Sequence, residues 1–125
     1  MQLRPTRTLG LRATFDYGMQ RRPAGGIDAW RGWAVIARWT ATTRVAAAAR
    51  WEWYSDPEQV IVATGQPYGL RVGGGSFNVD VVPAPHLLWR TELRGLRARD
   101  PLFPRGASEL TRRDGFVVSS LALTF

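Results

Sequence analysis

Apolar and polar residues alternate along several separate stretches of this chain, and this feature limits its possible folds more than any other. Successive side chains of a β-strand point to opposite faces of a sheet, so a period of two predicts strands with one apolar and one polar face. The segment from Gly10 to Gln20, for example, places Phe15, Tyr17 and Met19 on one face. The pattern predicts six strands, over residues 10–20, 33–41, 45–56, 75–82, 87–94 and 116–125. We therefore expect an all-β chain that forms an antiparallel meander.

A single Ala-rich helix is the alternative for residues 33–53, because alanines such as Ala47 and Ala48 favour helix. Thr40, Thr42 and Thr43 interrupt this segment. The alternation on either side of them does not fit a period of 3.6. The strand interpretation is therefore preferred.

The predicted connections fall into two lengths. Those at Ala41–Arg44 and Pro83–His86 are as short as tight turns, whereas those at residues 21–28, 55–70 and 96–115 are long. Outer-membrane barrels have short periplasmic turns at one end and long extracellular loops at the other. A soluble β-sandwich has no physical reason to sort its loops in this way, so the lengths favour a membrane barrel.

The composition excludes several classes of protein. With 45% hydrophobic residues and six Trp, the chain carries too much apolar surface for a disordered tail. Its uncharged stretches, such as those at residues 59–70 and 81–89, are far shorter than the ~20 apolar residues of a membrane-spanning helix. The absence of cysteine excludes disulfides and thiol chemistry. We expect no cofactor and no metal site.

The apolar faces of the predicted strands have two possible environments. In a soluble β-protein they pack into a core, whereas in a membrane barrel they meet lipid and the polar faces line the lumen. Aromatic residues near the strand ends support the membrane interpretation, because the girdles of barrels at the membrane–water interfaces consist of such residues. The residues assigned to this lipid-facing girdle are Trp33, Trp39, Trp51, Trp53 and Trp89. The residues expected to line the lumen are Arg38, Arg50, Glu52, Asp80, Arg90, Glu92 and Arg94, although a water-exposed face of a soluble protein could hold the same charges.

The last predicted strand ends on an aromatic residue, Phe125, with Val117, Leu121 and Leu123 at alternate positions before it. This arrangement resembles the C-terminal strand signature of outer-membrane proteins, which the barrel-assembly machinery recognises. The resemblance implies that these four residues form an insertion signal.

Four sequence stretches carry a wider resemblance, namely FDYGMQ at residues 15–20, RWEWYSDPE at 50–58, LLWRTELR at 87–94 and VVSSLALTF at 117–125. Over about residues 11–125, the chain resembles the last strands of the β-barrel porin family related to OmpL-like porins. The resemblance implies a transmembrane antiparallel barrel in the outer membrane of a Gram-negative bacterium. It also implies passive diffusion of small polar solutes rather than catalysis.

The N-terminal stretch MQLRPTRTLGLR lacks the apolar run of a signal peptide. Six strands are also fewer than the ~8 that a single-chain membrane barrel requires. We therefore expect residues 1–125 to be the C-terminal segment of a longer barrel, with its signal peptide and first strands outside this chain. Because lipid does not tolerate open sheet edges, the remaining strands or other copies would be needed to close the sheet.

All 17 basic residues are arginine, against 10 acidic residues. Arginines in a pore wall favour anions and acids favour cations. Counting Arg38, Arg50, Arg90 and Arg94 against Glu52 and Glu92 predicts a weak anion preference. A second group falls in the predicted loops, where we expect solvation or contact with anionic lipopolysaccharide; it comprises Arg97, Arg99, Arg105, Arg112 and Arg113.

An outer-membrane enzyme is the first rival function. The single histidine, His86, falls in a predicted turn and not near a lumen centre. Glu52 and Glu92 could form a carboxylate pair like that of a glycoside hydrolase, but each has an arginine two residues away on the same face. We expect both to form ion pairs rather than to act in catalysis.

A soluble basic β-domain that binds nucleic acid or another polyanion is the second rival. Such a site needs arginines and stacking aromatics on one face, whereas here most of them fall on opposite faces. Gly73, Gly74 and Gly75 could suggest a phosphate loop, but no GK[ST] follows them. We expect them to form a strand bend or bulge.

Overall fold

The computed structural model describes residues 2–3 and 8–125, and strands are its only regular elements. No helix in this part of the chain is long and apolar enough to span a membrane. The strands are β1 (Gln2–Leu3), β2 (Leu9–Arg21), β3 (Ile27–Thr40), β4 (Val45–Asp56), β5 (Leu70–Ala84), β6 (Leu87–Ala98), β7 (Phe103–Arg105), β8 (Glu109–Thr111) and β9 (Arg113–Leu123).

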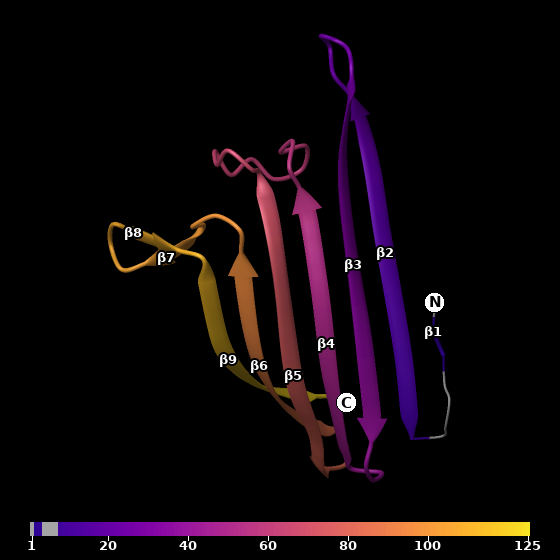
Figure 1. Cartoon of the computed structure of the whole chain (residues 1–125). Coiled ribbons are helices and arrows are strands. Elements are labelled where there is room, and N and C mark those ends of the chain that lie inside the picture. Colours follow the sequence, from indigo (N-terminus) through magenta and orange to yellow (C-terminus); the bar gives the residue numbers. More distant parts are fainter. Residues whose placement is uncertain (1, 4–7) are drawn as a thin grey trace.

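Seven strands form one antiparallel sheet in the order β1-β2-β3-β4-β5-β6-β9 (Figure 1). Each strand pairs with the next along the chain, except that the small β7–β8 hairpin lies between β6 and β9. The short turns after β3 and β5 lie at one end of the sheet, and the long connections lie at the other (Figure 1). The antiparallel meander expected from the alternation is therefore confirmed.

The strand bounds differ from the predicted ones mainly at the loop end. Only β4 has the predicted bounds, and residues 33–53 are two strands, so the helix alternative is wrong. The predicted loop over residues 96–115 instead contains the ends of β6 and β9 and the β7–β8 hairpin. At the other end, β9 stops at Leu123, so Phe125 lies beyond the strand that it was expected to end.

The expected bulge at Gly73, Gly74 and Gly75 is also wrong. These glycines pair in continuous register with β4 and β6, and the only irregularity between β5 and β6 in the described chain lies between Val81 and Ala84. The outward glycines Gly73 and Gly75 lie opposite Trp53 and Trp51, whose rings come within 3.7 and 3.3 Å of the positions that Cβ atoms would occupy. The glycines therefore make room for tryptophan rings.

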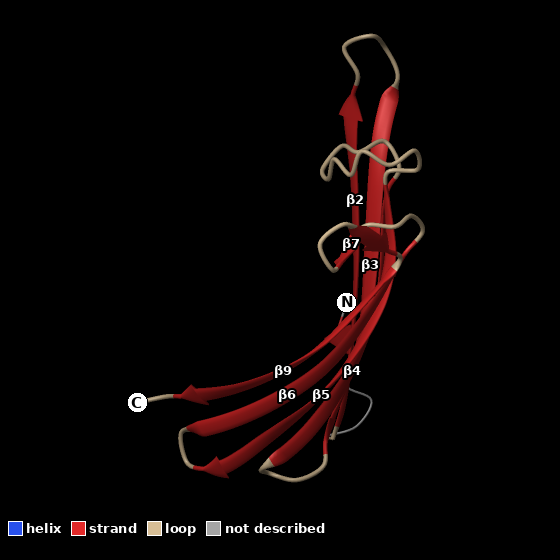
Figure 2. Cartoon of the chain, turned by 90° about the vertical axis from the view of Figure 1, so that its left-hand side faces the viewer, coloured by secondary structure: helices blue, strands red, loops and turns tan. Residues whose placement is uncertain are grey.

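The sheet is a single curved layer with no second layer packed against it (Figure 2). It exposes 9221 Å², whereas a compact soluble protein of 14.0 kDa exposes about 6,700 Å². Among the described residues, the buried hydrophobic ones are only Ala34, Ala46 and Ala98. A single layer with an uncovered apolar face is not a stable arrangement in water, but it is the arrangement of a barrel wall in lipid.

The register fixes which residues share a face. From β2 to β9, odd-numbered residues pair with odd-numbered residues as far as the irregularity after Val81. We call the face of the odd-numbered residues the outer face and that of the even-numbered residues the inner face. Along β4 the apolar outer residues run from Val45 to Trp53, which corresponds to about 26 Å at ~3.3 Å per residue. These nine residues correspond to the ~9–11 residues with which a tilted β-strand crosses the hydrocarbon core of a bilayer.

Ala48 and Ala49 are neighbours on β4 that lie on the inner and outer face, and they offer a matched test of this assignment. We expect Ala49→Glu to destabilise the protein in lipid by about 1–2 kcal/mol, less than Arg or Lys at mid-membrane, because its carboxylate would face hydrocarbon. Ala48→Glu would lie opposite Arg38 and should be nearly neutral. Urea unfolding in liposomes measures both, and equal effects would contradict the assignment of the faces.

Candidate functional site on the inner face

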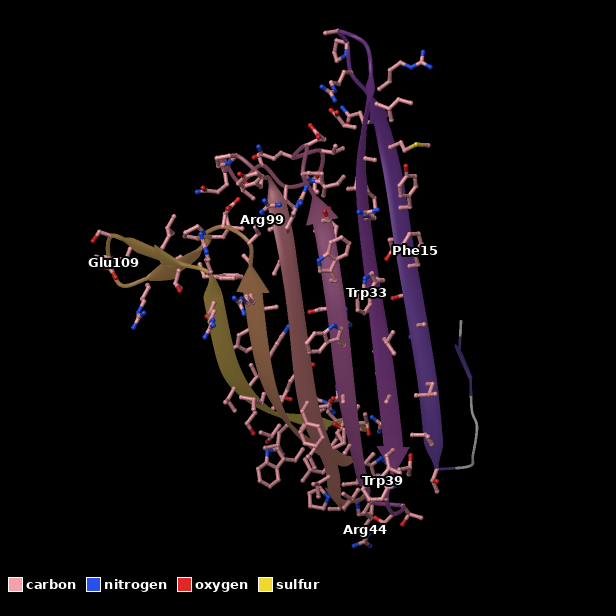
Figure 3. All side chains as sticks on the ribbon, viewed as in Figure 1. Phe15, Trp33, Trp39, Arg44, Arg99 and Glu109 are labelled. Atoms are coloured by element: carbon pink, nitrogen blue, oxygen red, sulfur yellow. The ribbon has the colours of Figure 1, made fainter. Side chains whose placement is uncertain are left out.

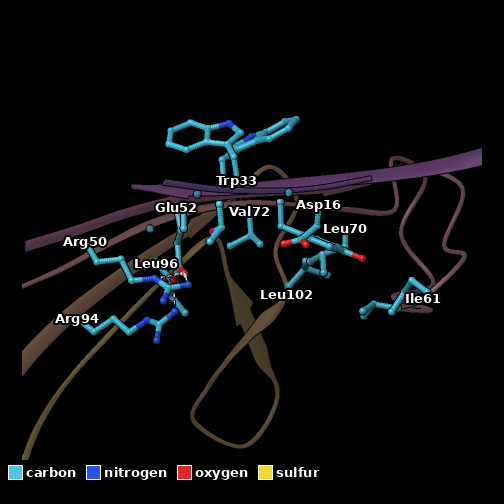
Figure 4. A pocket seen from close by; sticks show the side chains of 18 of the residues that line it. Asp16, Trp33, Arg50, Glu52, Ile61, Leu70, Val72, Arg94, Leu96 and Leu102 are labelled. Atoms are coloured by element: carbon cyan, nitrogen blue, oxygen red, sulfur yellow. Dashed lines mark hydrogen bonds and ion pairs between the residues drawn. The ribbon is translucent and has the colours of Figure 1, made fainter. Parts of the chain in front are cut away.

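All seven charged residues predicted to line a lumen lie on the inner face, because each is an even-numbered residue of β3 to β6. Five of them come from β4 and β6, which are separated by β5. Figure 4 shows Arg50, Glu52 and Arg94 on one side of the sheet and Trp33 on the other. The sheet also bends toward the side of these charges (Figure 4).

The first ion cluster is centred on Asp80 of β5. Arg90 donates two hydrogen bonds to the Asp80 carboxylate, from Nε to Oδ1 at 2.7 Å and from a terminal nitrogen to Oδ2 at 2.8 Å. Arg38 donates to Oδ2 at 2.9 Å, and the Asn78 amide donates to Oδ1 at 2.9 Å. The carboxylate is almost fully covered, while the Arg38 and Arg90 side chains remain 47% and 45% exposed.

The second cluster is centred on Glu52 of β4 and has the same composition. Arg50 donates from Nε to Glu52 Oε2 at 2.7 Å, and Arg94 binds Oε1 from two strands away. The glutamate side chain is 19% exposed, against 42% for Arg50 and 31% for Arg94. In both clusters two guanidinium groups share one carboxylate that lies deeper than they do.

The register also aligns a row of arginines that the sequence prediction missed. Ile36 of β3 is the cross-strand partner of both Arg12 on β2 and Arg50 on β4. Ser76 of β5 is likewise the partner of both Arg50 and Arg94 on β6. Arg12, Arg50 and Arg94 therefore lie in line on alternate strands. The alternation placed Arg12 on the polar face, but only the register shows that it shares this row.

Glu92 was expected to pair with the arginines two residues away on β6. Arg90 instead binds Asp80 on the neighbouring strand β5, Arg94 binds Glu52 two strands away on β4, and no ion pair of Glu92 is found within the described chain. The expected pairing of Glu92 is therefore wrong. The physical reason is that both arginines beside Glu92 are long enough to reach carboxylates on other strands, which replace the pairs along β6.

The five tryptophans predicted to form a girdle lie on the outer face, in two groups. Phe15, Trp33 and Trp53 are consecutive cross-strand partners toward the loop end, with Trp51 one step below. Trp39 and Trp89 lie toward the short turns, and Figure 3 shows the separation of Trp33 from Trp39 along β3. The sixth, Trp30, lies on the inner face, where its ring contacts that of Tyr54.

A family model described as "Putative beta-barrel porin-2, OmpL-like" matches residues 1–125. The chain belongs to this porin family. No curated protein and no solved structure matches it. The single curved sheet, with charge on one face and aromatic residues on the other, is consistent with a porin barrel of an outer membrane.

Loops lie against part of the inner face of this porin and line an open pocket of about 830 Å³ (Figure 4). Its charged side is formed by Arg50, Glu52 and Arg94, together with Asp16 of β2. Its apolar side includes Ile61 from the long loop and Leu102 from the connection before β7. The pocket therefore joins the second ion cluster to a loop-covered apolar surface.

The long loop of the porin, residues 57–69, is fixed by the last residue of β4. Asp56 is fully buried, and its carboxylate accepts hydrogen bonds from the main-chain N–H groups of Val60, Ile61 and Val62 at 2.8, 2.8 and 3.0 Å. At the other end of the loop, Gly69 has a φ of 61°, and a Cβ there would collide with the Asp56 carbonyl oxygen. The prediction placed Asp56 in a loop connection but did not identify it as the anchor.

The structure places the residues that an enzymatic function of the porin was considered to need. His86 lies in the turn after β5 with a φ of 66°, as expected for a turn residue. Glu52 is engaged by two arginines. The described chain contains no group of three or more His, Cys, Asp or Glu side chains that could hold a metal ion.

Three of the five predicted loop arginines belong to strands. Arg97 lies in β6 and Arg113 in β9, both on the outer face, and Arg105 lies in β7. Arg99 follows β6, and its guanidinium carbon lies 3.8 Å from the centre of the Tyr68 ring. The assignment of Arg97, Arg105 and Arg113 to a loop is therefore wrong.

The Asp56 anchor can be tested with a matched pair of substitutions. Asp56→Asn replaces one acceptor oxygen by an NH₂ donor and should leave buried N–H groups unpaired, at a cost of about 1–3 kcal/mol. Faster hydrogen exchange should follow at Val60, Ile61 and Val62, measured by mass spectrometry in detergent. Glu58→Gln removes the same charge from an exposed residue of the same loop and should leave exchange unchanged. Wild-type exchange in Asp56→Asn would contradict the anchoring role.

Proposed function

We propose that this porin segment forms part of a passive channel for small polar solutes with a weak preference for anions. The inner face would be the lumen wall, lined by the seven predicted residues and by Arg12. The outer face would meet lipid through its tryptophans, Trp33, Trp39, Trp51, Trp53 and Trp89. The membership of a porin family supports the channel, and the arrangement of charge on the inner face supports the selectivity.

The proposed anion preference rests on the difference in exposure between the carboxylates and the guanidinium groups of the ion clusters. The Asp80 carboxylate is 4% exposed, whereas the two arginines that bind it are each nearly half exposed. A passing solute would therefore meet guanidinium groups rather than carboxylates. Since each cluster holds two arginines and one acid, each also carries a net charge of +1.

The preference would be weak because acids balance most of the arginines. The seven predicted residues comprise four arginines and three acids. Adding Arg12 and Asp16, which share the inner face, leaves the excess of one positive charge unchanged. Field strength at the wall, and not a large charge excess, would produce the selectivity.

The channel requires closure of the sheet. Its two edges, at β1 and β9, would pair with further barrel strands or with other copies, because unpaired backbone groups are costly in lipid. This would make residues 1–125 the C-terminal part of a larger barrel in the Gram-negative outer membrane. Val117, Leu121, Leu123 and Phe125 would be the segment recognised by the barrel-assembly machinery; all four are exposed.

Reversal potentials across planar bilayers test the channel and its preference together. The full chain, refolded in lipid, should conduct with a higher permeability for chloride than for potassium. Glu52→Gln should increase this ratio, because it raises the charge of the second cluster from +1 to +2. Glu109→Gln, an equal change on the exposed β7–β8 hairpin, should not.

Either of two results would contradict the proposal. Cation selectivity of the wild-type channel would overturn the anion preference. Absence of conductance from protein that circular dichroism shows to be folded in the bilayer would overturn the channel itself.

A further inference from the structure

A row of glycines crosses the outer face near the loop end of the sheet. Gly75 of β5, Gly95 of β6 and Gly115 of β9 are consecutive cross-strand partners. A Cβ atom at Gly95 would have no other atom within 4 Å. Because the Trp51 ring lies against Gly75, the row forms a depression whose open floor is at Gly95, on a face that is otherwise covered mainly by large apolar side chains.

The side chains around this floor give the depression a defined shape. Trp51 and Trp53 lie on the β4 side, and Phe77, Leu93 and Val117 form the next row toward the short turns. The groove of about 1010 Å³ on the loop side of this row is open outward, and its lining includes Trp51, Trp53 and Gly95. It can therefore hold an extended apolar chain against the sheet.

Arginines cap the loop end of the groove. Arg97 and Arg113 are direct cross-strand partners on the outer face, one step beyond Gly95 and Gly115. Like charges in this position repel each other unless an anion lies between them. Neither forms an ion pair with an acid in the part of the chain that the structure describes.

A third arginine, Arg71 of β5, also lines the groove. Its Nε–H is buried and lacks a hydrogen-bond partner among the described residues, which is a costly state for a charged donor. The one acid beside the groove is Asp114, whose Oδ1 accepts a hydrogen bond from Gly115 N–H at 2.9 Å. The groove therefore keeps an excess of positive charge at one end.

The position of these arginines corresponds to the depth of lipid headgroups. Arg97 and Arg113 lie in the same cross-strand row as Trp33 and Trp53, at the edge of the apolar band, and Arg71 lies one step further toward the long loops. In outer-membrane barrels the long loops are extracellular, so this end lies in the outer leaflet. Guanidinium groups at this depth can bind phosphate oxygens in a fork geometry.

We propose that the groove binds one phosphorylated lipid of the outer leaflet, with an acyl chain over Gly95 beside the Trp51 ring and a phosphate held by Arg71, Arg97 and Arg113. This site rests on the proposed exposure of the outer face to lipid. It lies on the outer face of β4, β5, β6 and β9, and closure of the sheet would add backbone pairs at the edge of β9 without covering that face. The phosphate relieves the repulsion between Arg97 and Arg113, and the acyl chain fills the space that Gly95 leaves open.

Lipid retention measured by native mass spectrometry tests the site. The full chain is refolded in phosphatidylcholine liposomes containing bisphosphorylated lipid A, then extracted in mild detergent. Wild type should retain lipid A and should retain its dephosphorylated form at least about tenfold less, since charge-assisted hydrogen bonds contribute most of the affinity. Arg97→Gln combined with Arg113→Gln should cause a similar loss, whereas Arg44→Gln combined with Arg105→Gln, which removes the same charge elsewhere, should not.

Filling the groove gives a second, independent test. Gly95→Leu occupies open space and improves the strand-forming residue, so it should preserve folding while it blocks the acyl chain. Reduced lipid A retention in this variant supports the site. Wild-type retention in both Gly95→Leu and the Arg97/Arg113 double variant would overturn it, as would full displacement of lipid A by inorganic phosphate, which would indicate an anion site without an acyl groove.

The same variants separate this proposal from the channel. Arg97, Arg113 and Gly95 lie on the face away from the ion clusters, so their substitution should leave the reversal potential unchanged. Loss of lipid with unchanged selectivity supports the site on its own. Unchanged lipid retention in protein that conducts normally overturns the lipid site and leaves the channel standing.

Discussion

The continuous hydrogen-bond ladder between neighbouring strands is the constraint on which the rest of this structure depends. A hydrocarbon environment offers no partner to backbone N–H and C=O groups, so each strand must find its partners in its neighbours. Once the ladder is formed, alternate side chains must lie on opposite faces. The inner ion clusters and the outer aromatic rows are both consequences of this geometry. From β2 to β9, odd-numbered residues pair with odd-numbered residues and even-numbered residues with even-numbered residues, so each face is continuous across the sheet.

The two faces then meet opposite chemical requirements. On the inner face, cross-strand distances allow Arg90 to reach Asp80 and Arg94 to reach Glu52, so that carboxylates lie beneath guanidinium groups. On the outer face, tryptophan rings lie against Gly73 and Gly75, and the remaining glycines leave the groove open. The apolar face does not need a packed core, because lipid takes the place of the second layer.

The strand bounds were predicted correctly where the outward residues are apolar along almost the whole strand. In residues 45–56 every odd-numbered residue up to Trp53 is apolar, and β4 has those bounds. The alternation fails where outward positions hold glycine or arginine, as at Gly95 and Arg97 of β6. This failure explains why the loop-end parts of β5, β6 and β9 were assigned to connections: their outward residues are mainly glycine and arginine, although they lie in the same cross-strand rows as Trp51 and Trp53.

Other parts of the site depend on register, which a single strand does not reveal. The row of Arg12, Arg50 and Arg94 joins residues of three strands. The binding of the loop by Asp56 depends on a backbone path that residues 57–69 adopt only in the folded protein. Position along a strand could therefore be read from the sequence, whereas partners across strands could not.

Site-directed spin labelling of residues 46–49 tests the central claim most directly. These four consecutive residues are alanines of β4 in a chain without cysteine, so each can be replaced in turn by a single Cys, which is only one sulfur atom larger, and then labelled. In lipid vesicles, labels at Ala47 and Ala49 should be relaxed by oxygen dissolved in the membrane, and labels at Ala46 and Ala48 by a water-soluble nickel complex. The predicted result is that accessibility to oxygen alternates from residue to residue, with its maxima at residues 47 and 49. A uniform response, or the opposite phase, would contradict the assignment of one face to lipid and the other to an aqueous lumen.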